Sequence, residues 1–180
     1  MRQRITFFVL MFVTLFVGLT ALREVIGLYG QSLVQQSALL STYRASFTVA
    51  CGGAGDCVTI SPVSHPVSIR QIWISKPTNA ITVSLILRKT ADTGGTSTAG
   101  AGFPLDDSDA AATPSIKLYT VAPTAGTAIG TLMAQPLATT DTLVETLGTS
   151  NDKPAILNTQ NFAISVSGAA TIQGYVEWTQ

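Results

Sequence analysis

The residue types that could do chemistry are few and scattered along the chain. His65 is the single histidine and follows Ser64, but neighbours in sequence do not make a Ser–His–Asp geometry, and a turn residue is the expected role. Glu145 and Glu177 stand alone on predicted strands, so nothing pairs them for acid–base work. We therefore expect no catalytic residue, no enzyme activity and no cofactor.

One acidic group stands out in the sequence PLDDSDAA. Asp106, Asp107 and Asp109 could offer carboxylate oxygens to Ca²⁺. Their spacing does not match an EF-hand loop, which needs alternating ligands, a central glycine and a distal Glu. We expect a solvated acidic loop with no metal, and calcium binding stays open as the alternative.

Two cysteines, Cys51 and Cys57, enclose the short segment Gly-Gly-Ala-Gly-Asp. Glycines let so short a loop turn back on itself, and in an exported chain the two thiols are expected to form a disulfide. The alternative is two reduced thiols inside a reducing cell. A metal site would need more ligands than His65 supplies.

The organising element is an uncharged run of 18 residues, Ile5–Leu22. As a helix it would be about 27 Å long, close to the hydrocarbon thickness of a bilayer. It predicts a transmembrane anchor over residues 1–24, in contact with the lipid bilayer. Arg2 and Arg4 should stay on the cytoplasmic side, which leaves the rest of the chain extracytoplasmic or on a virion. A cleaved signal peptide is the alternative, but its apolar run is shorter and a small-x-small site follows it.

Residues 25–45 continue with apolar side chains at heptad spacing and polar side chains between them. This pattern predicts a helical stalk that associates with copies of itself as a parallel coiled coil. The alternative is a single amphipathic helix that lies on its own domain or on the membrane. The predicted oligomer seam contains Ile26, Tyr29, Leu33, Gln36, Leu40 and Tyr43.

From residue 46 to residue 180 the apolar pattern has a period of two, and glycines and prolines punctuate it roughly every ten residues. In the last strand, Ile172, Gly174, Val176 and Trp178 should face inward. Many short strands without a helical pattern predict an antiparallel β-sandwich or jelly roll. The predicted strands are 46–51, 57–61, 67–75, 80–89, 115–121, 128–134, 142–147, 155–157, 161–167 and 171–179, with a turn-rich stretch at 90–114. The fold class is thus mainly β, preceded by a long transmembrane and stalk helix.

Charged residues make up only 11% of the chain and the net charge is zero. Typical soluble domains have about 25% charged residues. No basic patch is present, so nucleic acid is not an expected partner. A surface so poor in charge suits a subunit that neighbours cover, although a Thr-rich β domain exposed outside a cell would have a similar composition.

The blocks LRKTADTGGTSTAG, PLDDSDAAATPSIKLYT, GTAIGTL and the closing YVEWTQ follow one another in a familiar order. Over Ile69 to Gln180 they resemble a β domain of structural proteins from tailed and other bacterial viruses. The resemblance implies a virion component, such as a capsid, fibre or spike protein, and brings no catalytic residues with it. The anchor and stalk lie outside it and would suit a virus with an internal membrane or a protein held in the host envelope during assembly.

Two functions of different kinds follow. The first is a membrane-anchored virion structural protein that contacts itself and other virion proteins. The second is an envelope-anchored bacterial adhesin or filament subunit. An enzyme or sugar-binding module would need a pocket built from Trp73, Tyr119 or Tyr175.

Overall fold

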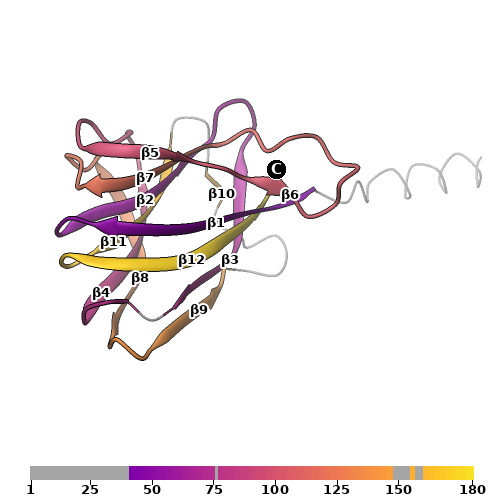
Figure 1. The fold of residues 1–180 in the computed structure, drawn as a ribbon. Helices are drawn as coiled ribbons and strands as arrows, with labels where there is room; N and C mark the ends of the chain where they lie inside the picture. Colours follow the sequence, from indigo (N-terminus) through magenta and orange to yellow (C-terminus); the bar gives the residue numbers. More distant parts are fainter. Residues whose placement is uncertain (1–40, 76, 148–154, 157–159) are drawn as a thin grey trace, which may run out of the picture. The chain divides into compact units, whose positions relative to one another are not determined.

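The computed structural model describes residues 41–75, 77–147, 155–156 and 160–180, and every regular element within these ranges is a β-strand (Figure 1). A mainly β fold is therefore confirmed for this part of the chain. The strands are β1 (Thr42–Cys51), β2 (Gly55–Ser61), β3 (Val67–Ser75), β4 (Ile81–Arg88), β5 (Thr96–Gly100), β6 (Phe103–Pro104), β7 (Ser115–Val121), β8 (Ala128–Leu137), β9 (Thr142–Thr146), β10 (Ala155–Ile156), β11 (Asn161–Val166) and β12 (Ala170–Thr179).

The strands form two antiparallel sheets in a sandwich-like arrangement. The first has the order β10-β3-β12-β1-β6, with β9 also paired to β3, and the second has the order β5-β7-β2-β11-β4-β8. Without the short strands and the β5–β7 pair, the orders are β1-β12-β3-β9 and β2-β11-β4-β8. The chain therefore crosses repeatedly between the sheets, and the two terminal strands of the domain, β1 and β12, lie side by side (Figure 1).

The longest pairing joins β1 to β12, from Thr42↔Thr179 to Cys51↔Ala170. Because side chains alternate along a strand, this register sets the same face of both strands toward the core. Ile172, Val176 and Trp178 are buried, as the alternation in the sequence predicts. The C-terminal strand is thus held in the middle of the first sheet.

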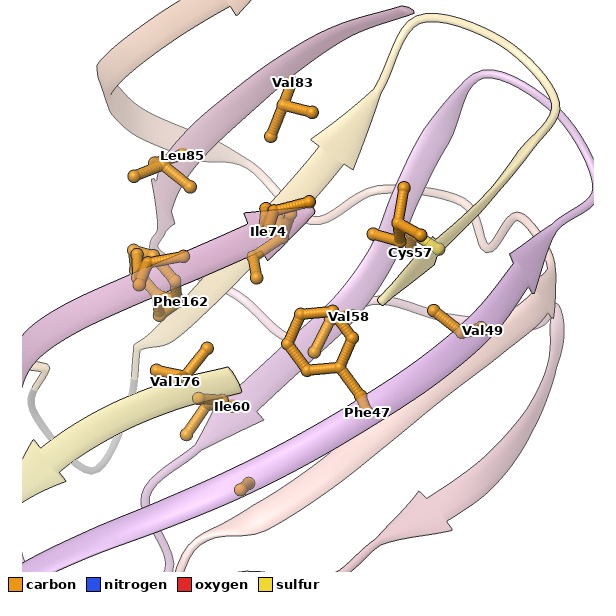
Figure 2. Close-up of a cluster of buried hydrophobic side chains, with 14 of the residues drawn as sticks. Phe47, Val49, Cys57, Val58, Ile60, Ile74, Val83, Leu85, Phe162 and Val176 are labelled. Atoms are coloured by element: carbon orange, nitrogen blue, oxygen red, sulfur yellow. The ribbon is translucent and has the colours of Figure 1, made fainter. Parts of the chain in front are cut away.

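Aliphatic and aromatic side chains from both sheets meet in a single core, part of which Figure 2 shows. Burial of each such side chain contributes about 1.5–3 kcal/mol relative to leaving it exposed. The largest buried ring, Trp178, stacks on Tyr43 with ring centroids 5.9 Å apart. The labelled core residues in Figure 2 include Phe47, Val49, Val58, Ile60, Ile74, Val83, Leu85, Phe162 and Val176.

The predicted boundary between stalk and β domain is wrong by four residues. β1 begins at Thr42, so residues 42–45 are strand instead of the end of a helix. Tyr43, expected on the oligomer seam, is 2% exposed and packs in the core. An aromatic residue fits both a heptad and an alternating pattern, and here the alternation Tyr43, Ala45, Phe47 determines its place.

The anchor Ile5–Leu22 and the remaining seam residues lie outside the described residues and stay predictions. Within the described ranges, no helix has the length and apolarity needed to cross a bilayer. The seam residues concerned are Ile26, Tyr29, Leu33, Gln36 and Leu40.

Candidate functional site

A disulfide joins the two sheets at one corner of the domain. Cys51 ends β1 in the first sheet and Cys57 lies in β2 of the second, with Cα atoms 5.6 Å apart. The bond predicted from the Cys-Gly-Gly-Ala-Gly-Asp-Cys segment is therefore confirmed. Gly55 has φ +137°, a conformation that L side chains rarely adopt, and a Cβ at Gly52 would lie 2.4 Å from the carbonyl oxygen of Thr120. The loop needs glycine at both positions.

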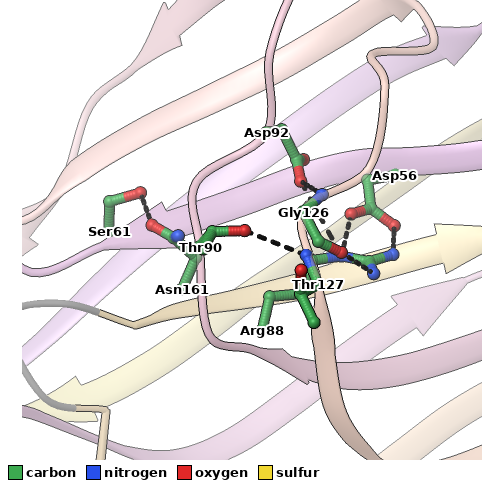
Figure 3. Close-up of polar contacts among 8 residues, drawn as sticks. All are labelled: Asp56, Ser61, Arg88, Thr90, Asp92, Gly126, Thr127 and Asn161. Atoms are coloured by element: carbon green, nitrogen blue, oxygen red, sulfur yellow. Dashed lines mark hydrogen bonds and ion pairs between the residues drawn. The ribbon is translucent and has the colours of Figure 1, made fainter.

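A buried ion cluster lies under the connection between β4 and β5 (Figure 3). The guanidinium of Arg88 donates from Nη2 to Asp56 Oδ1 at 2.5 Å and from Nε to Asp56 Oδ2, and Nη1 donates to the carbonyl oxygen of Gly126 at 2.9 Å. The Asp56 side chain is 0% exposed and the Arg88 side chain 8%. A bidentate Arg–carboxylate pair is among the strongest polar contacts that a protein interior can hold.

Asp92 adds a second carboxyl to the cluster. Its Oδ1 accepts the N–H of Gly126 at 2.9 Å and lies 3.7 Å from Arg88 Nε. Its Oδ2 is buried and has no hydrogen-bond partner. Burial raises the pKa of Asp92, and the neighbouring negative charge of Asp56 raises it further, although the Gly126 N–H and Arg88 act in the opposite direction.

The sequence offers little signal for this cluster. The alternation along β4 places Arg88 on the face of the strand that Ile81, Val83 and Leu85 do not share, and a side chain on that face would normally be exposed to solvent. The structure buries Arg88 instead, because Asp92 and Gly126 from two connections contact its guanidinium. Asp56 and Gly126 are distant from Arg88 in sequence, and periodicity cannot find such contacts.

The outer face of the first sheet carries an apolar row that runs across three strands and ends at Ser46 on a fourth. The register places Val144, Trp73, Tyr175 and Ser46 side by side on β9, β3, β12 and β1. Trp73 and Tyr175 stack with ring centroids 5.7 Å apart, and Val144 is 54% exposed. We call Val144, Trp73 and Tyr175 the outer apolar row.

A surface ion pair borders this row. The Arg44 guanidinium lies 4.4 Å from the centroid of the Tyr175 ring, and its Nε donates to Glu177 Oε1 at 2.9 Å. Tyr175 and Glu177 thus lie on the face opposite Val176 and Trp178, which were predicted to face inward. Trp73 is half-buried on the outer face, whereas Trp178 is in the core.

Strand β8 is one edge of the second sheet and carries no charged residue. Its register with β4 is shifted twice, where Leu132 and Ile129 are left without a partner residue. These two side chains are 42% and 50% exposed. Bulges of this kind re-aim side chains, and here they present two aliphatic groups at an open edge.

The other candidate residues lie on exposed turns or in the core. Asp106 Oδ1 accepts from the Ser108 N–H at 3.0 Å and hydroxyl at 2.7 Å, and these bonds lower the pKa of Asp106. His65 is exposed between β2 and β3, with its Nδ1 2.9 Å from Ser64 Oγ. Tyr119 is buried. Within the described residues, no three His, Cys, Asp or Glu side chains are grouped so that they could hold a metal ion.

Comparison of the chain with protein-family models, curated proteins and solved structures found no match.

Proposed function

We propose that this chain is a membrane-anchored structural protein of a virion, and that it acts through assembly contacts without catalysis. The observation that carries the proposal is the strand order β1-β12-β3-β9 against β2-β11-β4-β8. Two four-stranded sheets with this alternation form a jelly roll, an architecture that viral capsid proteins and lectins use. The order agrees with the virion resemblance of residues 69–180.

Because a fold hosts many functions, the proposal also needs a surface suited to assembly. The β8 edge is one such surface. Natural proteins protect edge strands with charged residues, proline or bulges, and β8 has Pro136 and two register shifts but no charged residue from Ala128 to Leu137. An edge of this composition suits a position against a neighbouring subunit.

The outer apolar row is a second such surface. Trp, Tyr and Arg are the residues that contribute most at protein interfaces, and a polar rim usually surrounds them. Trp73 and Tyr175 form the apolar centre here, and Arg44 and Glu177 lie beside it. This composition suits contacts with copies of the chain or with other virion proteins.

The predicted anchor and the disulfide support a place outside the cytoplasm. Ile5–Leu22 would hold the chain in a bilayer, and the Cys51–Cys57 bond is typical of oxidising compartments. We propose that the β domain lies on the virion, or on the outer side of the host membrane before assembly.

Particle incorporation tests the proposal. The full-length protein would be expressed in cells that make the virus. The test variant Leu132→Lys places a charge on the open β8 edge, and the control Val63→Lys places the same charge on an exposed turn. We expect wild-type and Val63→Lys chains to co-migrate with particles in a density gradient and Leu132→Lys to be depleted. A chain found only in the cell envelope would instead favour the adhesin or filament function.

A further inference from the structure

The buried ion cluster has an unbalanced charge. Asp56 and Asp92 bring two carboxyl groups to the one guanidinium of Arg88, and the side chains of Asp56 and Asp92 are 0% and 2% exposed. Arg88 uses Nε and Nη2 on Asp56, which leaves Asp92 only a 3.7 Å approach. If both carboxyls were ionised, one buried negative charge would lack a counterion, a costly arrangement in a protein interior.

The hydrogen bonds show the same deficit. Asp92 Oδ1 accepts from Gly126, but Oδ2 is buried without a partner. Both Asp56 oxygens already accept from Arg88. An ionised Asp92 would therefore carry the excess charge, whereas a proton on the Asp92 carboxyl removes it.

We propose that the Asp92 carboxyl holds a proton in the folded domain, and that this proton is a pH-dependent lock on the two connections that meet at the cluster. These connections are residues 89–95, between β4 and β5, and residues 122–127, between β7 and β8. Asp92 is on the first and Gly126 on the second.

Three further hydrogen bonds join the same two connections. Thr93 and Thr124 exchange hydrogen bonds at 3.0 and 2.8 Å, and the Thr127 N–H donates to the Thr90 hydroxyl at 2.9 Å (Figure 3). Since the bond from Gly126 N–H to Asp92 lies between these contacts, a change in the charge of Asp92 acts on all of them.

The charged and titratable groups that face Asp92 come from each packed element. They are Asp56 on β2, Arg88 on β4 and Tyr119 on β7. The pKa of Tyr119 is raised by burial and then by the charge of Asp92, so Tyr119 stays neutral where Asp92 titrates. Arg88 stays charged because its bond to Asp56 raises its pKa. Asp92 is therefore the group that changes its charge.

The direction of the effect follows from linkage. The pKa of Asp92 is raised in the folded state above its ordinary value of 3.8. The stabilisation by the proton is complete below pH 3.8 and is lost as the pH rises through the folded-state pKa. Between pH 3.8 and the raised pKa of Asp92, the equilibrium constant for opening the connections should rise up to about tenfold per pH unit. Above the raised pKa, this equilibrium constant should no longer change with pH.

Two measurements on the full-length chain in detergent test the lock. Carboxyl ¹³C NMR of aspartate-labelled protein reports the titration of each group. Amide hydrogen exchange, corrected for the intrinsic pH dependence, reports opening at Thr93, Thr124 and Gly126. We expect the Asp92 carboxyl to titrate above the ordinary aspartate range and the three amides to lose protection over the same pH interval.

Variants separate the effect of the Asp92 proton from a general effect of pH. Asp92→Asn is neutral at every pH and should make protection of the three amides independent of pH, whereas Asp107→Asn, in the exposed acidic loop, should leave the wild-type profile unchanged. The proposal is overturned if the Asp92 carboxyl titrates in the ordinary range. It is also overturned if Asp92→Asn keeps the pH dependence of the wild type. The NMR titration needs no variant, so a misfolded variant would not leave the question open.

Discussion

Replacement of Arg88 by Met should destabilise the β domain far more than loss of any surface ion pair. Met keeps most of the aliphatic volume of the side chain and removes the guanidinium, so Asp56, which is 0% exposed, would be left buried without its partner. Removal of one partner of a buried pair typically costs 3–5 kcal/mol. With a total stability of about 5–15 kcal/mol, such a loss is large.

Arg44→Met is the matched control. Arg44 also pairs with a carboxylate, but its side chain is 36% exposed and that of Glu177 13%. An exposed pair contributes about 0–1 kcal/mol, and the contact with the Tyr175 ring adds about 0.5–1 kcal/mol. We therefore expect a cost of about 1 kcal/mol for this variant.

Urea unfolding of the full-length chain in detergent, followed by tryptophan fluorescence, measures the difference. At an unchanged m-value, the midpoint urea concentration should fall several times further for Arg88→Met than for Arg44→Met. The double variant Arg88→Met with Asp56→Asn should recover part of the loss, because it removes the unpaired charge. If Arg88→Met costs no more than Arg44→Met, the cluster does not stabilise the fold as described.

Three further predictions concern the backbone, the disulfide and the stalk. Gly126→Ala would place a Cβ 2.0 Å from a backbone carbonyl oxygen of the facing connection, so it should lower the free energy of unfolding by about 1–3 kcal/mol in the same urea assay. Gly53→Ala, whose Cβ would have nothing within 4 Å, should leave this free energy nearly unchanged. Cys51→Ala should lower the free energy of unfolding by about 2 kcal/mol, and a reducing agent should no longer change the melting temperature of this variant. A wild-type melting temperature that the reducing agent leaves unchanged would contradict this prediction. Leu33→Asp with Leu40→Asp should convert the oligomer to monomers in detergent, and an unchanged mass would show that the predicted seam does not associate the chains.

Most strands could be predicted because the alternating pattern and the turn residues agree. The limits of β3 and β7 match the prediction, since Val67–Ser75 and Ser115–Val121 are rich in apolar residues and lie between turn signals. β5 and β6 were missed inside the turn-rich stretch 90–114. Thr96–Gly100 has small, exposed side chains without an apolar face, so only its pairing with β7 makes it a strand.

The candidate surfaces were only partly accessible to sequence reasoning. The disulfide is a local feature, because six positions separate its cysteines and glycines lie between them. The Asp56–Arg88–Asp92 cluster depends on β2, β4 and two connections meeting in space. The exposure of Ile129 and Leu132 depends on register shifts between β4 and β8 that no pattern in the sequence indicates.

Intact mass spectrometry of density-gradient fractions tests the central claim most directly. The account predicts that the full-length chain, with one disulfide and without cleavage near residue 22, co-migrates with purified virus particles. Its presence in the cell-envelope fraction and absence from every particle fraction would contradict a virion structural role. A mass that lacks the first twenty or so residues would show that Ile5–Leu22 belongs to a cleaved signal peptide and not to an anchor.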